Sequence, residues 1–271
     1  SSNTTGINHT VAIGYSALQA LTTGAGNIAI GYQAGDAMTD NTQNTIIGHQ
    51  AFTAADSGED NNVVIGHLAG SAIDNAAADG NVLIGRNAGV GGSGIMGSCI
   101  YIGNNAGENT HIRNQYDNIF IGAAAAGQAF AGQSDRNIGI GSLTMGAGAL
   151  NGANNNVAIG HSALNDLTTG GENNCIGAYA GDEITTGSRN VCIGYATGHQ
   201  MNANYNTLVG SYAGDTLTSG EENTIIGYDC DTASDDNTNN VIIGNHLTAT
   251  DKNNAVFIGN NTNHIENDFN A

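Results

Sequence analysis

The 271-residue sequence contains no proline and no tryptophan, and only five of its residues are basic. Charged residues make up 11% of the chain, less than half of the roughly 25% that is typical of soluble domains. Disordered chains are rich in charge or proline, so this composition argues against disorder. The sequence also lacks an apolar run of about 18 residues, and it therefore offers no transmembrane helix.

The scarcity of positive charge excludes two classes of partner. Twenty-four acidic residues give a formal net charge of −19, which repels nucleic-acid phosphates and anionic lipid surfaces. We therefore expect no nucleic-acid partner and no membrane insertion. Because the chain begins at Ser1 without an apolar leader, we interpret it as a processed product or an excised piece.

The sequence is instead rich in glycine, with 41 residues, and asparagine, with 39, which excludes a mainly helical protein. These residues belong to a repeat of the form N-x-x-[ILV]-G that occurs fifteen times between residues 10 and 262, with a mean spacing of about 17.5 residues. No break interrupts the series. We therefore predict one domain over residues 1–271, with coils over about 10–262 and a C-terminal end segment at 263–271.

Each column of the repeat has its own chemistry. The column four residues before the glycine is asparagine in twelve units: Asn27, Asn44, Asn62, Asn81, Asn118, Asn137, Asn156, Asn173, Asn190, Asn206, Asn223 and Asn240. Three columns follow the asparagine: the first is mostly β-branched, the second is apolar or small, and the third is almost always isoleucine. Since these columns alternate between the two faces of a strand, we predict that both faces are buried. The glycine suits a corner that needs positive φ or has no room for a side chain. An x-x-A-G segment follows, which we interpret as a second extended piece with a small inward residue, and then a polar loop.

A short strand that recurs once in every repeat cannot bury two faces alone, whereas stacked units bury both and pair their backbone groups. We therefore predict an all-β protein, a parallel β-solenoid of about fifteen coils. Stacked asparagines can form an amide ladder along its axis. The left-handed hexapeptide β-helix of acyltransferases is disfavoured, because it needs three motif copies per coil and this chain has one.

The best-matching units are Asn27–Gly35 and Asn156–Leu164. They resemble the head repeats of YadA-like trimeric autotransporter adhesins and the related repeats of phage and viral tail fibres. The resemblance implies a left-handed β-roll in each chain and three chains packed around a threefold axis as a rod. The longer period and the L-T-T-G loops are more similar to the fibre type.

The column after the glycine carries rings in several units, and it is a candidate surface-binding stripe for a receptor or glycan. An alternative is rim packing between neighbouring chains or coils. The stripe consists of Tyr15, Tyr32, His49, His67, His161, Tyr195 and Tyr228.

The sequence offers few sites for ions or thiols. Asp229, Asp231, Asp235 and Asp236 crowd one loop, which is either a Ca²⁺ site or simply a solvated acidic loop. We expect no other cofactor. The four cysteines are far apart, without the spacing of a metal site or a disulfide scaffold, and we expect buried free thiols.

No catalytic motif is present, and five basic residues are too few for the polyanion-cleaving sites that some β-helices carry. We therefore expect no enzyme. The leading hypothesis is a structural or adhesive fibre, extracellular, on a cell surface or on a virion, built as a homotrimer that presents a receptor-binding face. The alternatives are a subunit that stacks head to tail into a filament, and a monomeric ice- or glycan-binding solenoid. Three chains would carry a formal charge of −57, so assembly should depend on salt or divalent cations.

Overall fold

The structure is a computed structural model that describes residues 8–109, 113–128 and 130–269. The chain divides into two compact units, Ser1–Arg136 (unit 1) and Asn137–Ala271 (unit 2). The regular elements of the described residues are all β-strands, and none of these residues is helical. The prediction of an all-β parallel β-solenoid is confirmed, with about 14 turns.

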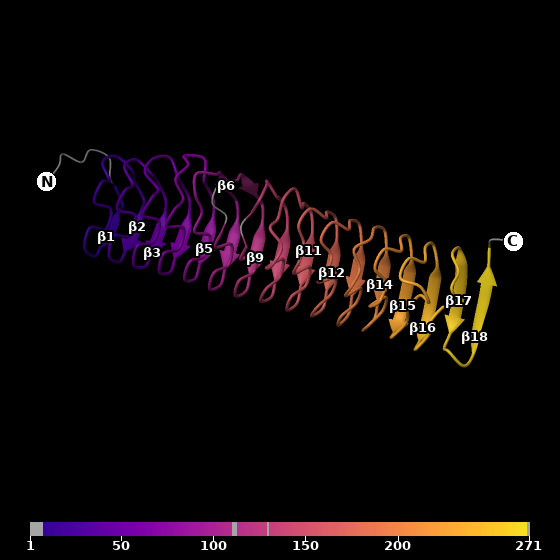
Figure 1. Cartoon of the computed structure of the whole chain (residues 1–271). Coiled ribbons are helices and arrows are strands. Elements are labelled where there is room, and N and C mark those ends of the chain that lie inside the picture. The colour runs from indigo at the N-terminus through magenta and orange to yellow at the C-terminus, as the bar shows by residue number, and fades with distance from the viewer. Residues whose placement is uncertain (1–7, 110–112, 129, 270–271) are drawn as a thin grey trace. The chain divides into compact units, whose positions relative to one another are not determined.

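In unit 1, seven repeat strands pair in parallel in chain order (Figure 1). They are β1 (Val11–Ile13), β2 (Ile28–Ile30), β3 (Thr45–Ile47), β4 (Val63–Ile65), β5 (Val82–Ile84), β7 (Ile100–Ile102) and β9 (Ile119–Ile121). A second, two-stranded parallel sheet pairs β6 (Met96–Gly97) with β8 (Gln115–Tyr116). The register aligns motif columns, because Ala29 lies opposite Ile46 and Ile30 opposite Ile47.

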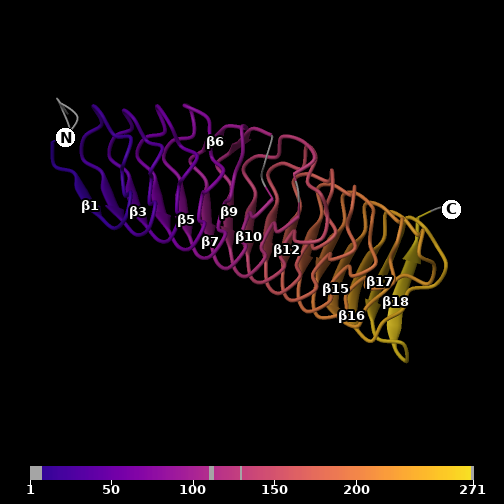
Figure 2. The ribbon, with the colours of Figure 1, turned by 60° about the vertical axis from the view of Figure 1, so that its left-hand side comes forward.

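In unit 2, eight repeat strands stack in the same way, as a second view shows (Figure 2). They are β10 (Ile138–Ile140), β11 (Val157–Ile159), β12 (Asn174–Ile176), β13 (Val191–Ile193), β14 (Thr207–Val209), β15 (Thr224–Tyr228), β16 (Val241–Asn245) and β17 (Ala255–Gly259). After the last repeat strand, β18 (His264–Asp268) pairs antiparallel with β17.

The core of each unit is lined by the middle residues of the repeat strands, except in β1, where Ala12 is exposed. From β2 onward these residues are completely buried, for example Leu83 in unit 1 and Leu208 in unit 2. The alanine of the x-x-A-G segment is also buried, as Ala34 and Ala213 show.

The prediction that both strand faces are buried is wrong for the single chain. The first and third residues of the strands point away from the core, and most are half-buried, as in β3 and β11. Successive side chains of a strand point to opposite faces, so only the middle column can enter a core enclosed by its own coil.

The segment after the repeat glycine is a turn and not the expected extended piece. Its second residue has positive φ in nearly every coil, for example 51° at Gln33. This conformation costs roughly 1–2 kcal/mol for an L-residue. A hydrogen bond between coils offsets that cost, since the Gln33 amide donates to the Tyr15 carbonyl at 2.8 Å.

The repeat glycine is required for both reasons that the sequence indicated. Gly31 has a φ of +143°, which L side chains rarely adopt. A Cβ atom at this position would lie 2.2 Å from the carbonyl oxygen of Gly48 in the next coil. The backbones of consecutive coils therefore approach too closely here for any side chain.

Candidate functional site

The asparagine column forms a buried hydrogen-bonded ladder in each unit. In unit 2, for example, the Asn156 Oδ1 accepts from the backbone amide of Asn173 at 3.0 Å and from its Nδ2 at 3.1 Å. The Asn173 Nδ2 also donates to the carbonyl of Gly187, in the loop before the next strand, at 2.8 Å. The column thus ties each strand to a loop and to the neighbouring coil. The twelve side chains, Asn27, Asn44, Asn62, Asn81, Asn118, Asn137, Asn156, Asn173, Asn190, Asn206, Asn223 and Asn240, are all buried.

The outer strand face is the most regular apolar surface of the two units. In unit 2, six isoleucines of the third strand column each keep 38–44% of their surface exposed: Ile140, Ile176, Ile193, Ile226, Ile243 and Ile258. In unit 1, Val11, Ile13 and Ile28 are exposed in the same way. We call this surface, in either unit, the aliphatic face. It presents no charged side chain from the strand columns that form it.

Four predicted stripe residues form a ring stack in unit 1. The ring centroids of Tyr15 and Tyr32 lie 5.4 Å apart at 12°, those of Tyr32 and His49 lie 4.9 Å apart at 17°, and those of His49 and His67 lie 5.4 Å apart at 25°. Each inner ring therefore has both of its faces against a neighbour. Tyr15, at the end of the stack, is 72% exposed.

In unit 2 the other three predicted rings, those of His161, Tyr195 and Tyr228, belong to a longer edge-to-face series. Centroids of consecutive rings lie 4.9–6.3 Å apart at 73–90°. The full series is His161, Tyr179, Tyr195, Tyr212, Tyr228 and His246. Three of these rings were not predicted from the sequence, because Tyr179, Tyr212 and His246 occupy the second column after the glycine and not the first. The signal that could have found them is that rings alternate between these two columns from coil to coil.

The ring series are held together by contacts between coils. Offset and edge-to-face aromatic pairs stabilise by roughly 0.5–1.5 kcal/mol each beyond their burial. Desolvation, and then the neighbouring phenols of Tyr195 and Tyr228, raise the pKa of Tyr212. Face-to-face stacking in unit 1 supports the alternative of packing between coils and leaves mainly ring edges there for a ligand. Glycan binding by the stripe stays a prediction.

The acidic loop of unit 2 has protein hydrogen-bond donors on its carboxylates. Asp231 accepts from Thr216 and from the Thr232 amide, and Asp235 accepts from Thr218. Asp229 Oδ2 lies 2.6 Å from His246 Nδ1, and Asp236 accepts from Ser234. Among the described residues, this loop contributes no group of three carboxylates whose ligand oxygens converge. Calcium binding by Asp229, Asp231, Asp235 and Asp236 stays a prediction.

The four cysteines, Cys99, Cys175, Cys192 and Cys230, are buried and free. Cys175 and Cys192 lie opposite each other on the paired strands β12 and β13, because they occupy the same column of the repeat. Burial raises the pKa of the Cys175 thiol well above its ordinary value, and burial raises that of Cys99 to about 11. At neutral pH these thiols are therefore protonated and poorly nucleophilic.

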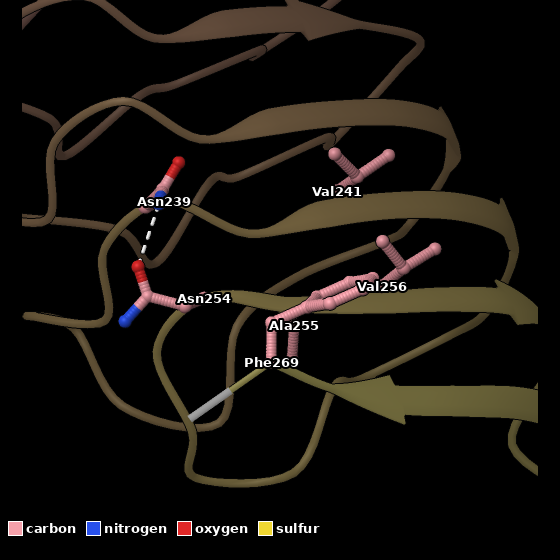
Figure 3. Close-up of a pocket in the computed structure, with 6 residues that line it drawn as sticks. All are labelled: Asn239, Val241, Asn254, Ala255, Val256 and Phe269. Atoms are coloured by element: carbon pink, nitrogen blue, oxygen red, sulfur yellow. Dashed lines mark hydrogen bonds between the residues drawn. The ribbon is translucent and has the colours of Figure 1, made fainter. Parts of the chain in front are cut away.

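A hollow of about 450 Å³ lies between the last repeat strands and the segment after β18 (Figure 3). Phe269 lies beside Ala255 and Val256, and the Asn239 Nδ2 donates to the Asn254 Oδ1 at 2.6 Å. The remaining lining residue is Val241. None of these six side chains is a nucleophile, a general base or a strong metal ligand, so the hollow offers no catalytic chemistry of its own.

Comparison with known proteins returned no relative. No protein-family model matches the chain, and neither a curated protein nor a solved structure matches it significantly. Within the described part of the chain, no helix is long and apolar enough to cross a bilayer.

Proposed function

We propose that this protein is a non-enzymatic structural or adhesive fibre subunit that assembles as a homotrimer through its aliphatic face. The observation that carries the proposal is the column of half-exposed isoleucines in unit 2. Complete burial of such a side chain contributes roughly 1.5–3 kcal/mol, so covering the exposed 38–44% is worth about 1 kcal/mol per residue. A second copy with the same spacing between coils would match this column residue for residue.

The repeat supports the same function. A solenoid positions identical side chains at fixed intervals, which suits a spacer or a presenting surface better than a catalytic cleft. The sequence resemblance to adhesin heads and tail fibres points to the same class of extracellular, cell-surface or virion protein. Receptor contacts would then come from the loops or the ring series, which stay exposed when the aliphatic face is covered in the trimer.

Head-to-tail growth into a filament has less support. Such growth needs free strand edges at both ends of the repeat. In unit 2 the outer edge of β17 is occupied, because β18 pairs with it antiparallel over five residue pairs. A parallel coil cannot add directly to β17 while β18 is in place.

The oligomeric mass of the purified chain tests the proposal. Light scattering should give three times the 27.4 kDa of the single chain. The double variant Ile193→Glu/Ile226→Glu places charges on the aliphatic face and should give the mass of one chain with an unchanged circular dichroism spectrum. Thr169→Glu/Ser219→Glu adds the same charge on exposed loop residues and should remain trimeric.

Other masses would overturn the proposal. A wild-type mass equal to that of one chain at all concentrations would favour the monomeric ice- or glycan-binding alternative. Long polymers would favour the filament. A trimer that tolerates both glutamates would place the interface elsewhere.

A further inference from the structure

Three carboxylates from consecutive loops of unit 1 meet at one point. Asp56 and Glu59 lie in the loop between β3 and β4, and Asp74 lies in the loop between β4 and β5. One carboxylate oxygen of each residue lies within 4.8 Å of one oxygen of each of the other two. Asp56 and Asp74 are exposed, whereas Glu59 is completely buried.

The Glu59 carboxylate is only partly satisfied by the protein. Its Oε2 accepts a hydrogen bond from the Asn41 Nδ2 at 2.7 Å. Its Oε1 is buried and has no hydrogen-bond partner among the described residues. A buried carboxylate oxygen without a donor is costly, and native proteins rarely retain one unless it serves a ligand. The unsatisfied atom therefore indicates a missing partner for the Glu59 carboxylate.

Among the described residues, no arginine, lysine or histidine side chain forms an ion pair with Asp56, Glu59 or Asp74. Like charges this close repel one another, and burial of one of them strengthens the repulsion. A cation held between the carboxylates would remove both the repulsion and the unsatisfied oxygen.

We propose that Asp56, Glu59 and Asp74 bind one Ca²⁺ ion. Calcium takes six to eight oxygen ligands at about 2.3–2.6 Å, so two ligands of one ion can lie up to about 4.8 Å apart. Magnesium demands a near-ideal octahedron with ligands at about 2.0–2.1 Å and gives up its waters reluctantly, so it suits a cluster of three protein carboxylates less well. Three carboxylates leave the remaining positions to water on the exposed side of the site.

The ion would link two consecutive loops that no disulfide joins. The loops differ in length from coil to coil, so their stacking is less strictly repeated than that of the strands. A shared Ca²⁺ would hold these two in one arrangement. Its binding energy would then stabilise unit 1 by mass action.

Calorimetric titration of the calcium-free full chain with CaCl₂ tests the site, with MgCl₂ as the competing ion. We expect one strong Ca²⁺ per chain, at least tenfold weaker Mg²⁺ binding, and a Ca²⁺-dependent rise in Tm. Glu59→Gln and Asp74→Asn should each weaken Ca²⁺ binding at least tenfold and abolish the rise. Asp74 is exposed, so its variant keeps the test valid if the Glu59 variant fails to fold. The control Glu222→Gln alters an exposed glutamate of unit 2 and should bind like the wild type.

Two outcomes would overturn the proposal. One is the absence of Ca²⁺ binding at millimolar concentration, which would mean that Glu59 carries a proton instead. The other is binding that survives Asp74→Asn but is lost in Asp231→Asn, which would place the ion in the acidic loop of unit 2. The mass of the assembly is measured separately, and neither result depends on it.

Discussion

The asparagine ladder makes a sharp prediction at Asn173 in unit 2. This side chain donates from Nδ2 to the Gly187 carbonyl at 2.8 Å and to the Asn156 Oδ1 at 3.1 Å. Its Oδ1 accepts from the backbone amide of Asn190 at 3.1 Å and from the Nδ2 of Asn190 at 3.0 Å. Substitution by alanine removes all four bonds at a completely buried position.

The cost follows from the groups that lose their partners. The Asn190 Nδ2 still donates to the Ala203 carbonyl, and the Asn156 Oδ1 still accepts from the Asn173 amide. The Asn190 amide and the Gly187 carbonyl have no such substitute. An unsatisfied buried polar group costs about 1–3 kcal/mol, so Asn173→Ala should destabilise the protein by about 2–6 kcal/mol.

Equilibrium unfolding in urea, followed by far-ultraviolet circular dichroism, measures this loss. With a slope of about 1–3 kcal/mol per molar urea, the midpoint should fall by at least about 0.7 M. The control is Asn174→Ala, one residue later, because that side chain is exposed and makes no hydrogen bond among the described residues. Equal midpoints for the two variants would refute the structural role of the ladder.

Two further predictions concern backbone packing and titration. Gly177→Ala should destabilise the protein by about 3 kcal/mol or more, because its Cβ would lie 2.0 Å from the Gly194 carbonyl oxygen at a φ of +141°. Gly152→Ala, whose Cβ meets no atom within 4 Å, should cost about 1 kcal/mol, and equal urea midpoints for the two variants would contradict the packing argument. Burial raises the pKa of Asp182 to about 6 although His199 opposes the shift, whereas an unfolded aspartate titrates at about 3.9. The contribution of Asp182 to stability is therefore complete below about pH 4 and is lost as the pH rises through 6. The Tm of the wild type relative to that of Asp182→Asn should fall over that interval. A Tm difference that does not change with pH would disprove this role of Asp182.

The sequence by itself determined the repeat, its strands and the position of its corners. The columns of β2 and β12 could be assigned because stacking returns each residue to the same environment, and a repeated environment selects a repeated residue type. The repeat glycine could be assigned to a tight corner for the same reason, because it recurs at the same place in every coil. The position of Cys175 opposite Cys192 on the neighbouring strand also follows from the column that they share.

The tertiary structure decided what the columns could not distinguish. All three strand columns are mostly apolar, so composition does not say which one faces the core; the pleat places Leu208 inside and leaves Ile193 and Ile226 outside. The antiparallel pairing of β18 lies beyond the repeat and has no column to predict it. Asp56, Glu59 and Asp74 meet through loops of unequal length, where counting residues gives no register. Side chains that meet in this way are brought together by the path of the backbone, which only the folded chain defines.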